Sequence, residues 1–150
     1  MEINTDGLLE WAIHMIKAND VHAKKIKSID KKENKLIVIS SDKISDYLIR
    51  TDITDINSVI DSLNANQEKL YLITLNTKNN IGSLIKNWAS LAKYQNLTIF
   101  FANPNSSLEK RWAIKPYFHD KISEKSSLSR GINAMSENVD ILILPAEIHN

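Results

Sequence analysis

The region from Leu70 to Pro104 constrains the fold most, because it combines two buried-type strands with an intervening helix. Leu70–Leu75 is a nearly continuous apolar run, typical of a strand that is covered on both faces. Apolar residues at helical spacing follow it, and Leu97–Phe101 is a second such strand. Two strands joined by a helix of this length should be parallel, with a right-handed crossover. The helical stripe consists of Ile81, Leu84, Ile85, Trp88, Leu91 and Ala92.

An asparagine follows each of the two predicted parallel strands. Asn76 comes directly after the first strand and Asn103 directly after the second. Parallel strands place both residues at the same carboxyl edge of the sheet, where ligands of open α/β sheets usually bind. Asn76 and Asn103 are therefore candidate ligand-binding residues, although asparagine is also a common turn residue. Asn79 or Asn80 is predicted to cap the intervening helix.

An amphipathic helix and a β-hairpin are predicted before this unit. The helix spans Gly7–Ala18 and is capped by Thr5 or Asp6. Lys24–Asp30 and Leu36–Ile39, separated by a turn-like stretch, form the hairpin. The first strand of the hairpin is polar, so we expect it at a sheet edge, where lysines discourage pairing with another chain.

The remaining segments complete the prediction of a single α/β domain with a mixed central sheet. Ile44–Ile53 fits either a third strand or a helical turn, and a short helix follows it. Leu108–Ile114 is also open between helix and strand. A last helix is predicted to begin after Ser126 or Ser127, and a short final strand at Val139–Leu144.

Composition argues against several kinds of chemistry. The 150 residues include no cysteine, which excludes thiol catalysis, disulfides, iron–sulfur clusters and thiolate zinc sites. Three scattered glycines cannot build either common phosphate-binding loop. The formal net charge of +1 favours neither nucleic acid nor membrane, and no apolar run approaches the ~20 residues of a membrane span. The start of the chain lacks the basic residues of a signal peptide, so a cytoplasmic location is predicted.

The order of the predicted elements resembles the core of the restriction-endonuclease-like superfamily of nucleases, over about the first two thirds of the chain. That superfamily binds a divalent metal through an acid on one central strand and through an acid, one residue and a lysine on the next. The equivalent strand here, Leu72–Leu75, has neither an acid nor a lysine. Asp42, Asp46 or Asp52 could supply the first acid, but a single acidic residue does not make a magnesium site. The resemblance therefore implies a catalytically inactive relative or a divergent fold.

The segment Arg111–Lys121 is predicted to follow the carboxyl edge of the sheet. Its composition is the most typical of a functional site, because it mixes cationic, aromatic, imidazole and carboxylate groups. His119, Asp120 and Lys115 are candidate catalytic residues. Arg111 and Lys115 are candidates for holding a phosphate or carboxylate. The alternative interpretation is an aromatic anchor with a charged rim that covers the sheet edge.

A basic cluster on the predicted hairpin indicates a third kind of site. A two-stranded ribbon with lysines can follow a phosphate backbone. However, Asp30 and Glu33 interrupt the cluster, and no aromatic residue is interleaved for base stacking. A solvated sheet edge is the alternative. The lysines are Lys24, Lys25, Lys27, Lys31, Lys32 and Lys35.

These patterns favour a non-enzymatic binding or interaction module. An enzyme of unrecognised type and a weak nucleic-acid binder are the alternatives. The sequence does not identify the partner: another protein and a second copy of the chain are candidates, since an exposed strand at either sheet edge could pair, nucleic acid is only weakly supported, and no membrane partner is expected. No cofactor and no metal site are predicted, because His14, His22, His119 and His149 are scattered along the chain.

Overall fold

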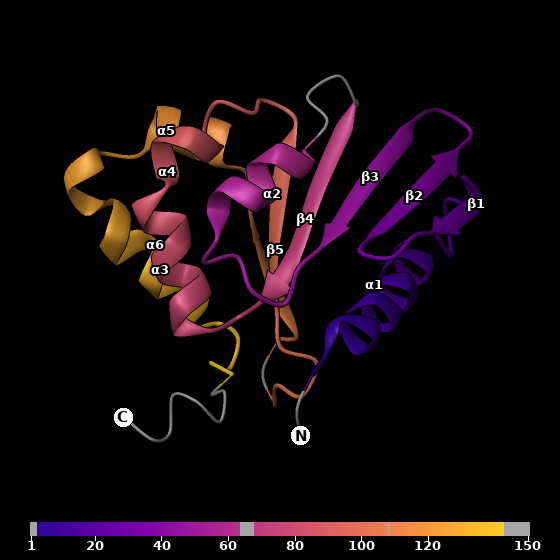
Figure 1. Cartoon of the computed structure of the whole chain (residues 1–150), viewed down its shortest axis with the longest axis horizontal. Helices are drawn as coiled ribbons and strands as arrows, with labels where there is room; N and C mark the ends of the chain where they lie inside the picture. The colour runs from indigo at the N-terminus through magenta and orange to yellow at the C-terminus, as the bar shows by residue number, and fades with distance from the viewer. Residues whose placement is uncertain (1–2, 64–67, 108, 143–150) are drawn as a thin grey trace.

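The computed structural model describes residues 3–63, 68–107 and 109–142 (Figure 1). These residues build one six-stranded sheet in which the strands follow their chain order. The first three strands form an antiparallel meander, the third to fifth strands are parallel, and the last strand is antiparallel to the fifth. The strands are β1 (Ile26–Lys31), β2 (Lys35–Ser40), β3 (Ile44–Ile49), β4 (Lys69–Leu75), β5 (Leu97–Ala102) and β6 (Arg111–Ile114).

Helices cover both faces of the sheet and bury two apolar cores (Figure 1). Side chains alternate between the faces along each strand, so Leu72 enters one core and Ile73 the other. The first core also takes residues of α2, α3, α4 and α6, and the second takes those of α1. The helices are α1 (Thr5–Asn19), α2 (Ile56–Ser62), α3 (Lys78–Lys86), α4 (Trp88–Leu91), α5 (Pro116–Ile122) and α6 (Leu128–Ser136), with a short 3₁₀ turn, η1 (Lys125–Ser127), before α6.

The predicted α/β class is confirmed, including the mixed sheet, the N-terminal helix, the edge hairpin, the parallel unit and the C-terminal helix. Of the open segments, Ile44–Ile53 is a strand up to Ile49. Leu108 lies outside the described residues, and Arg111–Ile114 is extended as β6. Pro116 then begins a helix that the sequence does not predict. Proline is tolerated in the first turn of a helix, because the N–H that it lacks would have no partner within the helix there.

The sequence predicts one continuous helix between β4 and β5, but the structure has two, α3 and α4. The helix breaks at Asn87, whose φ of −107° and ψ of 22° are not helical, and whose side chain donates to the carbonyl of Ser83 at 2.9 Å. Asparagine competes in this way with the backbone ladder of a helix. The predicted caps also differ: Thr77 caps α3, and Asn4 caps α1 by accepting from the N–H of Gly7 at 2.8 Å.

The prediction of a final strand at Val139–Leu144 is wrong for residues 139–142, which the structure describes. Residues 139–142 have no strand pairing, and residues 143 and 144 lie outside the described residues. The segment instead crosses the carboxyl ends of the parallel strands, where the N–H of Leu142 donates to the carbonyl of Asn76 at 2.9 Å. Buried asparagine side chains hold it there, and for that reason it does not extend the sheet.

Candidate functional site

The carboxyl ends of β4 and β5 bring Asn76 and Asn103 to the same end of the sheet, as the sequence predicts. The N–H of Asn76 donates to the carbonyl of Ala102 at 2.8 Å, so the two strand ends are directly joined. Both asparagines are buried, with exposed fractions of 0% and 4%. Buried amide groups are hydrogen-bonded in folded proteins, so their partners decide whether a ligand could use them.

The side chain of Asn76 is fully engaged by the protein. Its amide nitrogen donates to the carbonyls of Ser136 and Val139, both at 3.2 Å, and its oxygen accepts from the indole Nε1 of Trp112 at 2.8 Å. These bonds join β4, β6 and the end of α6. An asparagine amide has two N–H donors, and both are used here. Asn76 is therefore a structural junction.

Asn103 has the same function on the neighbouring strand. Its amide nitrogen donates to the carbonyl of Asp140 at 3.0 Å, and its oxygen accepts from the N–H of Asn105 at 3.0 Å. The Asp140 carboxylate in turn accepts from the N–H and the hydroxyl of Ser107, at 2.8 and 2.9 Å. These two bonds lower the pKa of Asp140. Residues 139–142 are thus fastened over the carboxyl end of the sheet, and we call this arrangement the carboxyl closure.

Asn80, which the sequence analysis predicts as a helix cap, is instead a buried link between three segments. Its oxygen accepts from the N–H of Ile53 at 2.9 Å. Its nitrogen donates to Thr51, Thr74 and Leu75 at 2.9 to 3.1 Å. Ser83 adds a bond from its hydroxyl to the carbonyl of Ile53 at 2.7 Å. The loop after β3 is therefore held against β4 and α3 by Asn80 and by Ser83, a residue that sequence reasoning did not single out.

The remaining candidates lie at both ends of the sheet because β6 reverses the chain. Arg111 pairs with Ala102 at the carboxyl end, and its guanidinium lies 6.0 Å from the ring centroid of Phe100. Ile114 pairs with Ile99, nearer the amino end of β5, so Lys115 and α5 lie at the opposite end of the sheet. In Figure 1 the arrow of β4 points down, whereas α4 and α5 are at the top.

His119 and Asp120 contact Trp88, and neither lies beside Asn76 or Asn103. Asp120 accepts from the indole Nε1 of Trp88 at 2.8 Å, and the ring of His119 meets that of Trp88 edge-on, with centroids 5.5 Å apart. Lys115 is exposed at the N-cap of α5. The structure therefore separates His119, Asp120 and Lys115 from Asn76 and Asn103, so these residues do not form one site.

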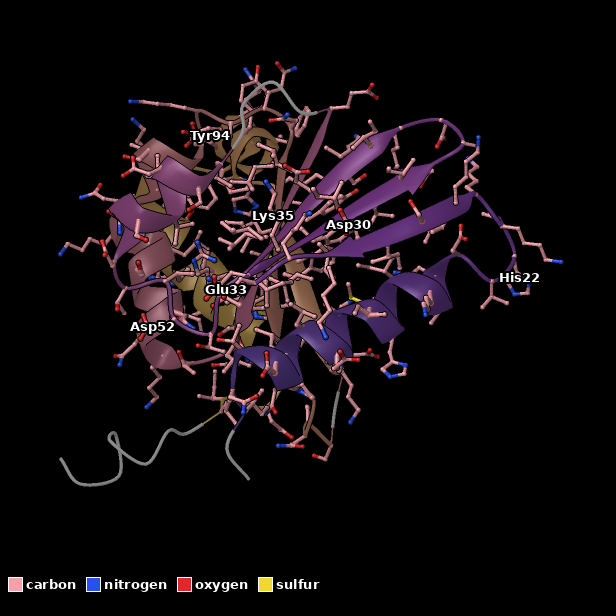
Figure 2. All side chains as sticks on the ribbon, turned by 45° about the vertical axis from the view of Figure 1, so that its right-hand side comes forward. His22, Asp30, Glu33, Lys35, Asp52 and Tyr94 are labelled. Atoms are coloured by element: carbon pink, nitrogen blue, oxygen red, sulfur yellow. The ribbon has the colours of Figure 1, made fainter. Side chains whose placement is uncertain are left out.

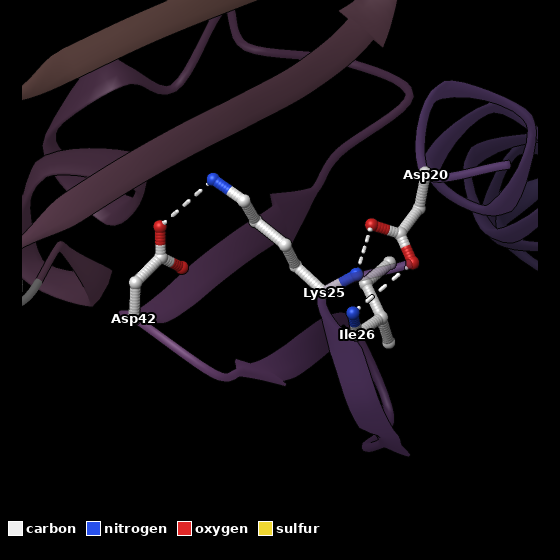
Figure 3. Close-up of polar contacts among 4 residues, drawn as sticks. All are labelled: Asp20, Lys25, Ile26 and Asp42. Atoms are coloured by element: carbon white, nitrogen blue, oxygen red, sulfur yellow. Dashed lines mark hydrogen bonds and ion pairs between the residues drawn. The ribbon is translucent and has the colours of Figure 1, made fainter. Parts of the chain in front are cut away.

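Carboxylates balance most of the lysines on the hairpin. Lys25 illustrates the arrangement in Figure 3: its ammonium lies 3.3 Å from Asp42, while Asp20 accepts from the N–H groups of Lys25 and Ile26. Lys25 also lowers the pKa of Asp42 by hydrogen bonding. Figure 2 shows Lys35 and Asp30 on the hairpin strands. The other pairs are Lys31 with Glu10 at 2.8 Å, Lys32 with Asp30 at 3.2 Å and Lys35 with Asp46 at 3.1 Å. A phosphate backbone would have to compete with these carboxylates.

A row of aromatic side chains crosses the central strands on the face that α1 packs against. The rings of Tyr47 and Tyr71 are stacked with centroids 4.3 Å apart, and Phe100 continues the row at 5.9 Å. Burial raises the pKa of both tyrosines. The rings stack on one another across the strands, so their faces are already covered and the row serves packing.

An open groove lies between α4 and the segment from α5 to α6. Its apolar lining includes Trp88, Ala89 and Ala92 of the α4 region and Leu128 of α6, and its volume is about 460 Å³. Asp120 is the acid in this lining, and it already accepts from Trp88. The groove also has a cationic lining: Lys86, Lys93 and Lys125. We call it the lysine-rimmed groove.

A second hollow of about 640 Å³ adjoins the groove at the amino end of the sheet and shares Lys93 with it. Phe118 of α5 lines this hollow together with Tyr94, which Figure 2 shows near the top. Phe118 is 49% exposed, and Ile122, one helical turn later, is 85% exposed. Large apolar side chains exposed together mark candidate contact surfaces. The amino end of the sheet is therefore open, in contrast to the carboxyl closure.

Comparisons with known proteins add no relative: no protein-family model, curated protein or solved structure matches the chain. The resemblance to the nuclease superfamily therefore stays a prediction. Over the described ranges, no group of three or more histidine, aspartate or glutamate side chains is placed to hold a metal ion. None of the helices in those ranges is both long and apolar enough to cross a membrane.

Proposed function

We propose that this chain is a non-enzymatic interaction module that binds an acidic, amphipathic segment of a partner protein in the lysine-rimmed groove. The observation that carries the proposal is the combination of an apolar floor and a cationic rim in one open groove. The apolar side chains suit one face of an amphipathic segment, and the lysines suit carboxylates on its flanks. Recognition of an amphipathic helix in an apolar groove is a recurring mode of peptide binding.

The charge of the rim supports an acidic partner. Lys86, Lys93 and Lys125 take part in none of the ion pairs found within residues 3–63, 68–107 and 109–142. This distinguishes them from the hairpin lysines, most of which face a carboxylate. Rim charges mainly raise the association rate and select partners of opposite charge. The groove should therefore reject basic segments of the same apolar pattern.

A display library of short random peptides tests the proposal without assuming a partner. We expect the enriched peptides to combine acidic and apolar residues, and to bind K86E/K93E/K125E at least about tenfold more weakly, since charge repulsion replaces attraction at three positions. The matched control is K17E/K24E/K27E, which changes the same charge at exposed lysines elsewhere. Equal loss in both variants, enrichment of basic peptides, or no enrichment would reject the groove as the binding site.

A further inference from the structure

The two edges of the sheet differ in how well they are protected against pairing. At β1, the register shifts between Ile26 and Ser28, and Asp20 accepts from the N–H groups at the start of the strand. Bulges and lysines of this kind block addition of a further strand. Among the residues that the structure describes, β6 is the other edge and pairs with β5 alone. Its register with β5 is regular over the whole strand.

The hydrogen-bond phase shows which backbone groups of β6 point outward. The N–H of Asn103 donates to the carbonyl of Lys110 at 2.8 Å, so these two residues form a hydrogen-bonded antiparallel pair. Hydrogen-bonded pairs alternate with non-bonded pairs, so Trp112 and Ile114 direct their backbone groups towards β5. Arg111 and Ala113 therefore direct theirs to the open edge.

We infer that two copies of this chain pair antiparallel through β6, with Arg111 opposite Ala113 and Glu109 opposite Lys115. In a twofold antiparallel ladder, hydrogen-bonded pairs form between residues whose backbone groups point to the open edge. For β6 this leaves the registers centred on Arg111, Trp112 or Ala113. Centring on Arg111 opposes two arginines, and centring on Ala113 places Arg111 against Lys115. Like charges directly opposite are destabilising, whereas the register centred on Trp112 opposes Glu109 and Lys115 twice.

The side chains of β6 suit this pairing. Ala113 is exposed and small, so it leaves room for the Arg111 side chain of the second copy. Trp112 and Ile114 face the core of their own subunit and stay buried. Glu109 and Lys115 are both exposed, which lets their charges meet without loss of an existing ion pair within the described residues. The result is one sheet continuous across two copies.

Sedimentation equilibrium over a range of concentrations tests the dimer in the unmodified chain. We expect reversible dimerisation, weakened about tenfold by E109K and restored by E109K/K115E, because the double change reverses both charges and keeps them complementary. K86E/K93E/K125E should leave dimerisation unchanged, so failure of the groove proposal and failure of this one are distinguishable. A monomer at all concentrations would overturn the dimer.

Cross-linking through introduced cysteines tests the register. The chain has no native cysteine, so only the introduced thiols can react. Paired residues of an antiparallel ladder lie about 5.5 Å apart, so E109C/K115C should be joined between copies by a short thiol-specific linker. In the single variant E109C, the cysteines of the two copies lie roughly 20 Å apart along the ladder, so the short linker should not join them. Efficient linking of E109C alone, or none in the double variant, would refute the register.

Discussion

The two ends of the parallel strands differ in how their polar side chains are used. At the carboxyl end, Asn76 and Asn103 are buried and hold residues 139–142 in place. At the amino end, lysines surround an apolar groove that nothing in the described chain fills. Residues 139–142 thus cover the usual location of ligands in α/β sheets, where a hollow of about 430 Å³ remains beside them between α3 and α6, and the lysine-rimmed groove lies at the other end. The location of a site depends on which strand ends remain open, as well as on topology.

Asn76 should give the largest loss of stability if the carboxyl closure is structural. We expect N76A to lower the free energy of unfolding by about 3 kcal/mol, since it leaves buried carbonyls and the indole of Trp112 without partners. N79A, at an exposed position of the next helix, should change it by less than about 0.5 kcal/mol. Urea denaturation measures both. Equal effects would show that the buried amide is dispensable.

Asn103 should have a smaller effect than Asn76, because it bonds fewer groups. We expect N103A to cost about 1–2 kcal/mol in urea denaturation, through loss of the bond to the carbonyl of Asp140 and of the turn at Asn105. N105A removes a neighbouring exposed amide side chain and serves as the control. A larger loss for N103A than for N76A would reverse the ranking that the hydrogen bonds predict.

Asp120 tests the amino end of the comparison. D120A removes the acceptor of the Trp88 indole, and we expect a loss of about 1 kcal/mol in urea denaturation, because the bond is only partly buried. D120N keeps an acceptor and should recover most of this loss. If D120A proved as costly as N76A, the two ends would not differ in the way described.

Asp140 should give the smallest effect, which is best seen in how steeply stability declines in acid. Its pKa is lowered in the folded protein by the N–H and hydroxyl of Ser107. A lowered folded pKa contributes stability above the unfolded pKa, and this contribution disappears as the pH falls through the folded value, below about pH 4. We expect D140N to have a flatter decline of thermal stability between pH 5 and about pH 2 than the unmodified chain. Identical declines would exclude Asp140 as a contributor.

The sequence was sufficient for the two parallel strands β4 and β5, because Leu70–Leu75 and Leu97–Phe101 are apolar runs typical of buried strands. It also placed Asn76 and Asn103 at one end of the sheet. It could not show that residues 139–142 return to that end, since the bonds from Asn76 to Val139 and Asp140 span 63 and 64 residues of chain. Local patterns do not encode such long-range partners.

The position of α5 was missed for a related reason. The sequence suggested that Arg111–Lys121 follows the carboxyl edge, but the short strand β6 carries the chain back to the amino end. Four residues are too few to show a reliable period of two. The lysine-rimmed groove was also hidden, because Lys93 and Lys125 come together only through the packing of α4 against the α5–α6 segment.

Exchange of the tryptophan indole protons tests the difference between the two ends most directly. The Nε1 proton of Trp112 is bonded to buried Asn76, whereas that of Trp88 is bonded to Asp120 at the edge of the open groove. Measured by NMR in deuterated solvent, the Trp112 proton should exchange only with global unfolding, and the Trp88 proton much faster. Equal rates, or faster exchange at Trp112, would contradict a closed carboxyl end and an open amino end.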